Sequence, residues 1–155
     1  MNDIHKRIAA SFQQQGLMST LRAELVSVED GEVYIALPFA SDLSQHHGYL
    51  HAGVITTIVD NACGYAAFSL MPPDVAVLTV EFKTNLLAPA AGQRFRFHAV
   101  VIKPGRTLTI CDARAFAHDG TAEKLIATMT GTLMAVQERG AIARSAVGRN
   151  RQVLD

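Results

Sequence analysis

The chain has 155 residues, of which 49% are apolar and 18% are charged, and its formal net charge at pH 7 is zero. This length is typical of one domain with a single hydrophobic core, and the balanced charge gives no indication of a nucleic-acid or membrane-surface partner. No apolar run approaches the roughly 18 residues of a membrane span, and the N-terminus lacks the apolar core of a signal peptide, so we expect a cytoplasmic protein.

The first part of the chain is predicted to form one short helix and a hairpin. Residues 3–14 place apolar side chains every four residues, which favours an amphipathic helix, and Gly16 is expected to end it. Over residues 20–38 apolar and polar side chains alternate, as they do in strands with one buried face. Asp30-Gly31 divides this stretch, and an Asp-Gly between two alternating runs is a strong hairpin signal.

A long apolar stretch follows, and one carboxylate interrupts it. Residues 52–69 are apolar on nearly every face of the helix that they would form, which is typical of a helix enclosed by the rest of the protein. Asp60 lies in the middle of this stretch. An ionised carboxylate in apolar surroundings costs several kcal/mol unless it is paired, hydrogen-bonded or held in a cleft. We therefore expect a catalytic role for Asp60, the structural alternative being a carboxylate that caps a loop or pairs with an arginine.

Four strand-like segments complete the pattern, at residues 75–87, 94–103, 107–117 and 125–136. The last three are separated by turn residues and predict a meander of long antiparallel strands. A helix that is apolar all round, beside about six such strands, is best accommodated if the sheet curls around the helix, so the predicted class is α+β. The edge strands of such a sheet are usually paired, often with a second copy of the chain, and we expect a homodimer.

We expect a single domain over residues 1–136, followed by a tail over residues 137–155. Four arginines make this tail basic, and we interpret it as a solvated or frayed end in preference to a binding arm. The two cysteines, Cys63 and Cys111, have no metal-like spacing and are expected to be small buried residues.

The start of the 52–69 helix offers a second chemical feature. Its first backbone N–H groups have no partner within the helix, and the helix dipole makes this end electropositive. The amides of Ala52 and Gly53 are therefore suited to a carbonyl oxygen that gains negative charge. Asp60 lies about 12 Å further along the helix axis, which is too far for one reacting carbon to contact both groups. Two such helices, antiparallel across a dimer interface, would bring the start of one beside Asp60 of the other.

Three segments carry a resemblance to a known family: GYLHAGVITTIVDNACGYAA, LTVEFKTNLLAPAAG and KPGR. Together they resemble the hotdog-fold acyl-CoA thioesterases of the phenylacetyl-CoA thioesterase (PaaI-like) type, whose hallmark is a His-Gly-Gly segment followed by an Asp. The match covers residues 12–136. It implies a helix wrapped by an antiparallel sheet, dimers that often pair into tetramers, and hydrolysis of an acyl-CoA to the free acid and CoA without a metal or an organic cofactor.

The resemblance assigns catalytic roles to five residues. It implies that Asp60 is the nucleophile or the base for water, that the Ala52 amide forms the oxyanion hole, and that the His51 side chain helps to position the site. Thr79 corresponds to a Ser or Thr that orients water, and Gln45 to an Asn that precedes the family His. Two positions depart from the family pattern: Gln45 is longer than the Asn, and Ala52 replaces a Gly but keeps its amide.

Substrate-binding candidates follow from position and from the same resemblance. Lys103 and Arg106, in a turn after a strand, are placed like the basic residues that receive the phosphates of CoA. Gly53 leaves room for the substrate at the start of the helix. Apolar residues beside the central helix are candidates for a pocket that takes a medium-chain or aromatic acyl group, or for the core. They are Tyr49, Leu50, Tyr65, Phe68 and Met71.

A metal site is the main alternative use of the histidines. His47 and His51 stand four residues apart, as two ligands on one helix face would, and His46 precedes them. Gly48 lies between the two, however, and no third carboxylate or cysteine is near in the sequence. We therefore expect no metal.

Two other functions are compatible with the same fold. The departures from the family pattern motivate a non-catalytic acyl-CoA-binding or regulatory module. The absence of an added DNA-binding domain from these 155 residues counts against a transcriptional version of it. A hydratase or dehydratase is less favoured, because Tyr65 stands where such enzymes usually carry a His after the Asp. The thioesterase is the hypothesis that explains both the presence of Asp60 in an apolar helix and its spacing from His51.

Overall fold

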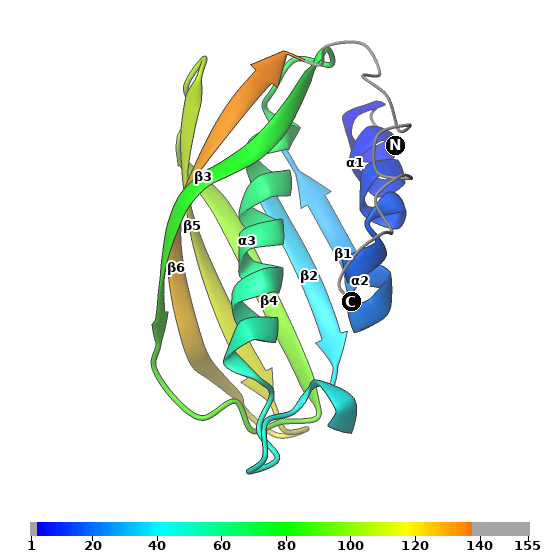
Figure 1. Cartoon of the computed structure of the whole chain (residues 1–155), viewed down its shortest axis with the longest axis vertical. Helices are drawn as coiled ribbons and strands as arrows, with labels where there is room; N and C mark the ends of the chain where they lie inside the picture. Colours follow the sequence, from blue (N-terminus) through cyan, green and yellow to red (C-terminus); the bar gives the residue numbers. More distant parts are fainter. Residues whose placement is uncertain (1–2, 138–155) are drawn as a thin grey trace, which may run out of the picture.

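One long helix, α3, lies along the concave face of a single six-stranded antiparallel sheet (Figure 1). The computed structural model describes residues 3–137. The elements in chain order are α1 (Asp3–Gln14), α2 (Gly16–Leu21), β1 (Glu24–Glu29), β2 (Glu32–Pro38), the 3-10 helix η1 (Ser41–Leu43), α3 (Ala52–Ser69), β3 (Val75–Leu86), β4 (Arg94–Lys103), β5 (Leu108–His118) and β6 (Glu123–Gln137). The expected basic tail lies, from residue 138 onward, outside the described residues.

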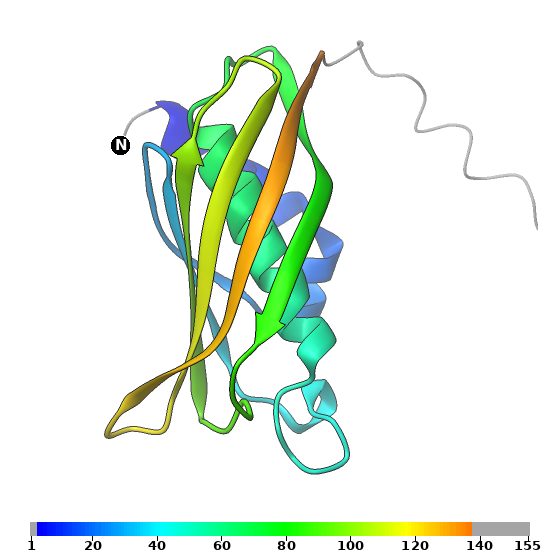
Figure 2. The same cartoon turned by 90° about the vertical axis from the view of Figure 1, so that its left-hand side faces the viewer.

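The strand order is β1-β2-β4-β5-β6-β3, and every neighbouring pair is antiparallel. β4, β5 and β6 form the predicted meander, whereas β3 lies at the far edge and pairs only with β6, from Val75 opposite Gln137 to Leu86 opposite Ala127. β1 and β3 are therefore the two edges, and the sheet does not close into a barrel (Figure 2). This arrangement confirms the α+β class and the hotdog fold.

The turn between β1 and β2 confirms the predicted Asp30-Gly31 hairpin. Glu29 and Glu32 pair across it, and Gly31 has a φ of +79°, in the left-handed region that favours glycine. A Cβ added at Gly31 would lie 3.2 Å from the Leu70 side chain, at the end of α3. The turn therefore packs directly against the end of the central helix.

The chain after α1 differs from the prediction. Gly16 does not end the helical region but begins α2 after a one-residue break, so residues 20 and 21 belong to a helix, and β1 starts only at Glu24. Met18 and Leu21 stand three residues apart, and both side chains are buried. The packing of one helical turn therefore overrides the alternation seen in the sequence.

α3 has the predicted bounds, but the prediction that it is enclosed on all sides is wrong. The residues that face the sheet are 0–3% exposed: Ile55, Ile58, Val59, Ala62, Cys63 and Ala66. A stripe at three- and four-residue spacing stays partly open to solvent, and we call Gly53, Thr57, Asp60, Gly64 and Phe68 the open stripe. Neither α3 nor any other helix within residues 3–137 is long and apolar enough to cross a membrane.

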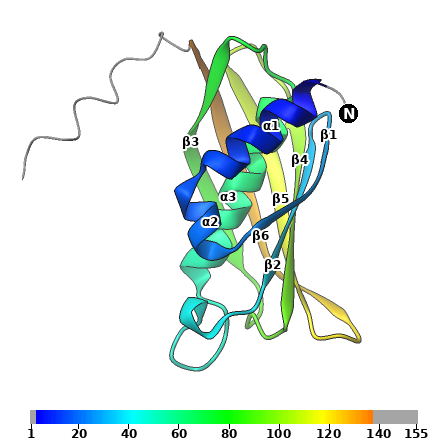
Figure 3. The ribbon, with the colours of Figure 1, turned by 90° about the vertical axis from the view of Figure 1, so that its right-hand side faces the viewer.

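α1 lies across α3 on the side opposite the sheet, which makes α1 a third layer (Figure 3). Ile8 is fully buried between them and belongs to the core. The terminal nitrogens of Arg7 donate to the backbone oxygens of Phe68, Met71 and Pro72 at 2.9 to 3.1 Å. Arg7 thereby holds α1 against the C-terminal end of α3, where the carbonyl oxygens lack the i+4 amide that a continuing helix would provide.

Candidate functional site

The start of α3 leaves one backbone amide without an acceptor. His51 is the N-cap residue, with an extended backbone (φ −63°, ψ 137°), and its Nδ1 accepts a hydrogen bond from the Gly53 N–H at 2.9 Å. The next two amides donate to the His51 carbonyl oxygen. Within residues 3–137 the Ala52 N–H donates to no protein acceptor. Of the two amides that the sequence indicated, that of Ala52 is therefore the one available to a ligand.

The loop before α3 engages Gln45 with its own backbone. The Gln45 N–H donates to the Tyr49 carbonyl oxygen at 2.9 Å, and the Gln45 side-chain oxygen accepts a hydrogen bond from the His47 N–H. Within one protomer, Gln45 does not line the cavity beside Asp60 that is described below. Its observed contacts shape the loop that leads into His51.

The candidate acyl-pocket residues divide between core, surface and cavity. Leu50 and Met71 are 2% and 7% exposed and belong to the hydrophobic core, which is one of the two roles that the sequence left open for them. Tyr49 is 38% exposed on the loop. Tyr65 and Phe68 line the cavity described below.

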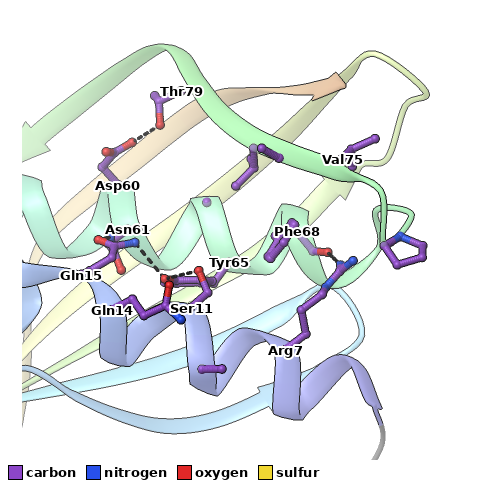
Figure 4. A pocket seen from close by; sticks show the side chains of 15 residues that line it. Arg7, Ser11, Gln14, Gln15, Asp60, Asn61, Tyr65, Phe68, Val75 and Thr79 are labelled. Atoms are coloured by element: carbon purple, nitrogen blue, oxygen red, sulfur yellow. Dashed lines mark hydrogen bonds between the residues drawn. The ribbon is translucent and has the colours of Figure 1, made fainter. Parts of the chain in front are cut away.

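Asp60 lies half-buried in the middle of the open stripe and accepts a hydrogen bond from β3. Thr79 Oγ1 donates to Asp60 Oδ1 at 2.8 Å (Figure 4). In the described part of the chain, no salt bridge pairs Asp60 with a cation. Burial raises the pKa of the Asp60 carboxyl above its ordinary value, and the hydrogen bond from Thr79 opposes part of this rise. The Asp60 carboxylate is therefore a stronger base than an exposed one.

A cavity of about 530 Å³ lies beside Asp60, between α1, α3 and β3. Asp60 and Thr79 line one end, and Arg7 and Phe68 line the other (Figure 4). A Cβ added at Gly64 would have no heavy atom within 4 Å, so the space continues over this residue. Asp60, Gly64 and Phe68 of the open stripe thus form the floor of the cavity, and α1 and β3 are its walls.

Four polar side chains on the α1 side of the cavity form one hydrogen-bonded group, which we call the polar cluster: Ser11, Gln15, Asn61 and Tyr65. Asn61 Nδ2 donates to Gln15 Oε1 at 2.7 Å, and Gln15 Nε2 donates to Tyr65 Oη at 2.8 Å. Tyr65 Oη lies 3.2 Å from Ser11 Oγ. Sequence reasoning found only Tyr65, because it used the apolar spacing of α1 alone. Ser11 and Gln15 stand four residues apart beside that apolar stripe, and this spacing is the signal that would have indicated them.

β4 ends at Lys103, Arg106 follows in the next turn, and this end of β4 lies opposite the start of α3 along the sheet (Figure 1). Both side chains are exposed. The Val101 N–H in the same part of β4 donates to the Gly31 oxygen, at the turn that packs against the end of α3. One protomer therefore does not bring these basic residues together with the Ala52 amide at the start of α3.

The histidines do not converge on a common point that a metal would occupy. Within residues 3–137 no group of three His, Cys, Asp or Glu side chains is placed to hold a metal ion. The His46 and His47 rings lie 3.9 Å apart, and His51 is turned toward Gly53. Both cysteines, Cys63 and Cys111, are free and buried, as predicted.

Comparisons with known proteins give one consistent family. The family model of the thioesterase superfamily matches residues 47–124. A thioesterase family protein from Silicibacter pomeroyi is 52% identical, with a TM-score of 0.84 over 85% of this chain and 97% of that one. The 1,4-dihydroxy-2-naphthoyl-CoA hydrolase of Listeria monocytogenes is 27% identical over 124 residues, 80% of this chain and 98% of that protein. The E. coli PaaI protein from the phenylacetic acid degradation operon is 18% identical and shares the fold, with a TM-score of 0.76 over 84% of this chain and 91% of that one.

Proposed function

The chain belongs to the thioesterase superfamily and is a thioester hydrolase, and on this premise we propose that it hydrolyses an acyl-CoA with a medium-chain or aromatic acyl group to the free acid and CoA. The activity named for the Listeria relative, on a CoA thioester, supports this substrate class. Assignment to the PaaI-like type within the superfamily is part of the same proposal, since the likeness to the E. coli PaaI protein is one of fold.

The observation that carries the proposal is the environment of the Asp60 carboxylate. It is a half-buried carboxylate on the floor of a cavity, hydrogen-bonded to Thr79, with a raised pKa and no paired cation among residues 3–137. As a base, Asp60 takes a proton from water while the water oxygen bonds to the thioester carbonyl carbon. As a nucleophile, Asp60 forms that bond itself, and water then cleaves the resulting anhydride. In both routes the C–S bond breaks, CoA leaves as the thiol after gaining a proton, and the free acid remains.

The Ala52 amide of a second protomer is proposed to stabilise the oxyanion that forms on the carbonyl oxygen. Within one helix, Ala52 and Asp60 are about 12 Å apart along the axis, so the complete site needs two α3 helices that run antiparallel. The His51 side chain supports this role because its Nδ1 accepts the Gly53 N–H and does not occupy the Ala52 N–H. The Ala52 N–H has no acceptor within residues 3–137. Gln45 is proposed to position the loop before His51, and Thr79 to orient the carboxylate or the attacking water.

The β3 edge supports the proposed homodimer. β3 pairs with β6 on one side only, and five apolar side chains in its middle and at its end are 47–55% exposed. They are Leu78, Val80, Phe82 and Leu86, followed by Leu87. An uncovered apolar edge strand is usually paired with another strand, and pairing β3 with its copy would bring the two open stripes together. Further pairing of dimers into tetramers remains part of the proposal.

The CoA moiety is proposed to lie outside the cavity, along both protomers. In an antiparallel pair, the end of one protomer that carries Lys103 and Arg106 is directed toward the start of α3 in the other. These cations would receive the CoA phosphates, while Tyr49 and Gly53 border the entrance at the start of α3.

The test is the initial rate of CoA release from short, medium, long and aromatic acyl-CoAs, for the wild type, Asp60→Asn and Asp74→Asn. Asp74 is exposed and does not line the cavity, so it is a matched control for the loss of a carboxylate. We expect Asp60→Asn to lose hydrolysis and Asp74→Asn to keep it. Undiminished hydrolysis by folded Asp60→Asn would contradict the proposal, and binding of acyl-CoA without release by any of the three proteins would favour the non-catalytic module.

The dimer has a separate test. Sedimentation velocity at the micromolar concentrations used for the assay is expected to give a dimer or a larger assembly. A monomer with full activity would contradict the shared site, because one protomer cannot supply Asp60 and the Ala52 amide to one carbon.

A further inference from the structure

The β3 edge carries two opposite charges that form no ion pair in the described part of the chain. Glu81 and Lys83 are both exposed, and they lie on the same face of β3 because they are two residues apart. Glu81 accepts a hydrogen bond from Thr132 at 3.1 Å. Lys83 donates to Asn85 at 2.5 Å. Since neither side chain forms a salt bridge within residues 3–137, both charges are available to a neighbouring strand.

Phe82, between these two residues, lies on the other face of the strand. It pairs with Gly131 of β6, and a Cβ added at Gly131 would lie 3.7 Å from the Cys63 side chain of α3. Phe82 therefore faces the side of the sheet on which α3 lies. Its side chain is 47% exposed, so one protomer leaves much of this ring uncovered.

β3 runs alongside α3 in the opposite direction. Val75, its first residue, follows soon after the end of α3. Beyond the other end of the strand, the Ala90 oxygen accepts a hydrogen bond from the Leu50 N–H at 3.1 Å, just before α3 begins. The 2.8 Å hydrogen bond from Thr79 to Asp60 fixes how far the two elements are displaced along each other. A position on β3 can therefore be matched to a position on α3.

The proposed shared site then limits where the two-fold axis of the dimer crosses β3. With Ala52 of one protomer beside Asp60 of the other, the axis passes level with the midpoint between them, about 6 Å from Asp60 along α3. At about 3.3 Å per strand residue, the same level on β3 lies about two residues beyond Thr79. The bulge between Thr79 and Glu81 takes up part of this distance. The axis therefore crosses β3 near Glu81 or Phe82.

Charge selects among the registers near this level. Directly opposite residues of an antiparallel pair carry side chains on the same face, and like charges there are destabilising. An axis through Glu81 places this carboxylate opposite its own copy, and an axis through Lys83 does the same for the ammonium group. An axis through Phe82 instead places Glu81 of each protomer opposite Lys83 of the other, which gives two equivalent ion pairs. It also places the two Phe82 rings opposite each other on the α3 side.

We infer that two β3 strands pair about an axis through Phe82, and that the reciprocal contacts of Glu81 with Lys83 fix the register that brings Ala52 to Asp60. This inference rests on the proposed hydrolysis at a shared site and names the residues that align one protomer with the other. Moving the axis by one residue displaces the protomers by two residues, about 7 Å. Such a slip separates the amide from the carbonyl that it is proposed to bind. Glu81 and Lys83 are thus positioning residues, which act through the pairing of the strands.

Disulfide cross-linking of single cysteine variants tests the register. The two Cβ atoms of Phe82→Cys would lie on the axis, about 5 Å apart, a distance that a small adjustment closes to that of a disulfide. Those of Val80→Cys and Thr84→Cys, two residues from the axis, would be about 13 Å apart. Oxidised glutathione is the oxidant, and it is reduced as the disulfide forms. The native Cys63 and Cys111 are fully buried and do not compete.

We expect a covalent dimer on non-reducing gels for Phe82→Cys and little or none for the two neighbouring variants. Preferential cross-linking through residue 80 or 84, or no cross-linking through residue 82, would overturn the register.

Charge reversal tests the two ion pairs. Glu81→Lys and Lys83→Glu each place like charges opposite each other, twice per dimer, whereas the double variant restores both pairs with their ends exchanged. We expect each single variant to raise the dimer dissociation constant, and to lower kcat/KM at one fixed protein concentration, by about tenfold or more. The double variant should return both quantities to within about threefold of the wild type. Added salt should reduce the losses, because exposed charges are screened.

Glu29→Lys is the matched control for charge reversal. Glu29 is exposed on β1, at the opposite edge of the sheet, and its reversal should leave association and hydrolysis unchanged. Single reversals at β3 that keep wild-type association, or a double variant as impaired as the single ones, would overturn the inference, because direct pairing of the two charges allows neither result.

The cross-link and the dissociation constant are measured without substrate, so the failure of this inference is distinguishable from the failure of the proposed function. Hydrolysis that depends on Asp60, in a protein without the cross-link at residue 82, overturns the inference alone. A dimer with that cross-link that hydrolyses no acyl-CoA overturns the proposed function and leaves the pairing of the strands in place.

Discussion

The two sides of α3 have opposite properties although they belong to one apolar helix. The side that faces the sheet carries Ile55, Ile58 and Val59 at 0–3% exposure and continues through small buried residues. Apart from Phe68 at its end, the open stripe carries short or polar side chains, with Asp60 at its centre and Gly64 one turn further on. The first side buries apolar area and stabilises the fold, while the second leaves the space and the carboxylate that the proposed hydrolysis uses.

The largest expected effect is a difference in the free energy of unfolding between substitutions on the two sides of α3. Ile58→Ala removes a fully buried side chain and should lower the free energy of unfolding by about 2–5 kcal/mol. Thr57→Ala, at the adjacent position on the open stripe, should change it by about 0.5 kcal/mol or less. Urea unfolding at one fixed protein concentration measures both. Equal losses for the two variants would contradict the division of α3 into a structural and an open side.

The next effect tests the amide at the start of the open stripe. Ala52→Pro removes the N–H, and proline is well tolerated at the first position of a helix when the preceding residue is extended, as His51 is. We expect kcat to fall by about 10²–10³, the usual consequence of losing one oxyanion donor, with little change in the melting temperature. Ala52→Ser keeps the N–H and is the control. A folded Ala52→Pro variant with wild-type kcat would exclude this amide as the oxyanion donor.

The smallest effect is a shift of the pH profile. In the proposed mechanism Asp60 acts in its ionised form, so kcat/KM should rise with pH through the raised pKa of its carboxyl. Thr79→Val removes the hydrogen bond that stabilises the ionised form, so the pKa rises further and the acidic limb of the profile moves to higher pH. Thr130→Val is the control, because Thr130 bonds Asp112 instead. A limb that stays in place, or moves to lower pH, would show that Asp60 is not the titrating group.

Local patterns predicted the elements around the site well. The apolar run identified α3 with its bounds, Asp30-Gly31 identified the hairpin, and turn residues identified the meander. The pairing of Thr79 with Asp60 was expected only from the resemblance to a family, since no local pattern relates a strand residue to a helix residue that precedes it.

Other features were missed because neighbouring residues do not encode them. α2 forms because the side chains of Met18 and Leu21 pack in the core, and this packing overrides the alternation that predicted a strand. The spacing also left open whether Leu50 belongs to a pocket or to the core, and in the structure it is 2% exposed and packs in the core. The sequence alone also did not indicate that one side of an apolar helix stays open.

The sequence by itself determined α1, α3, the strands and the residue types at the start and centre of α3, because helical and strand periods relate residues that are close along the chain. Only the tertiary structure decided which side of α3 stays open and that Ser11 and Gln15 meet Asn61 and Tyr65 there. These contacts join residues 46 to 54 positions apart. They depend on how α1 docks over α3 and on β3 lying at the edge of the sheet, and both are set by the packing of the whole core.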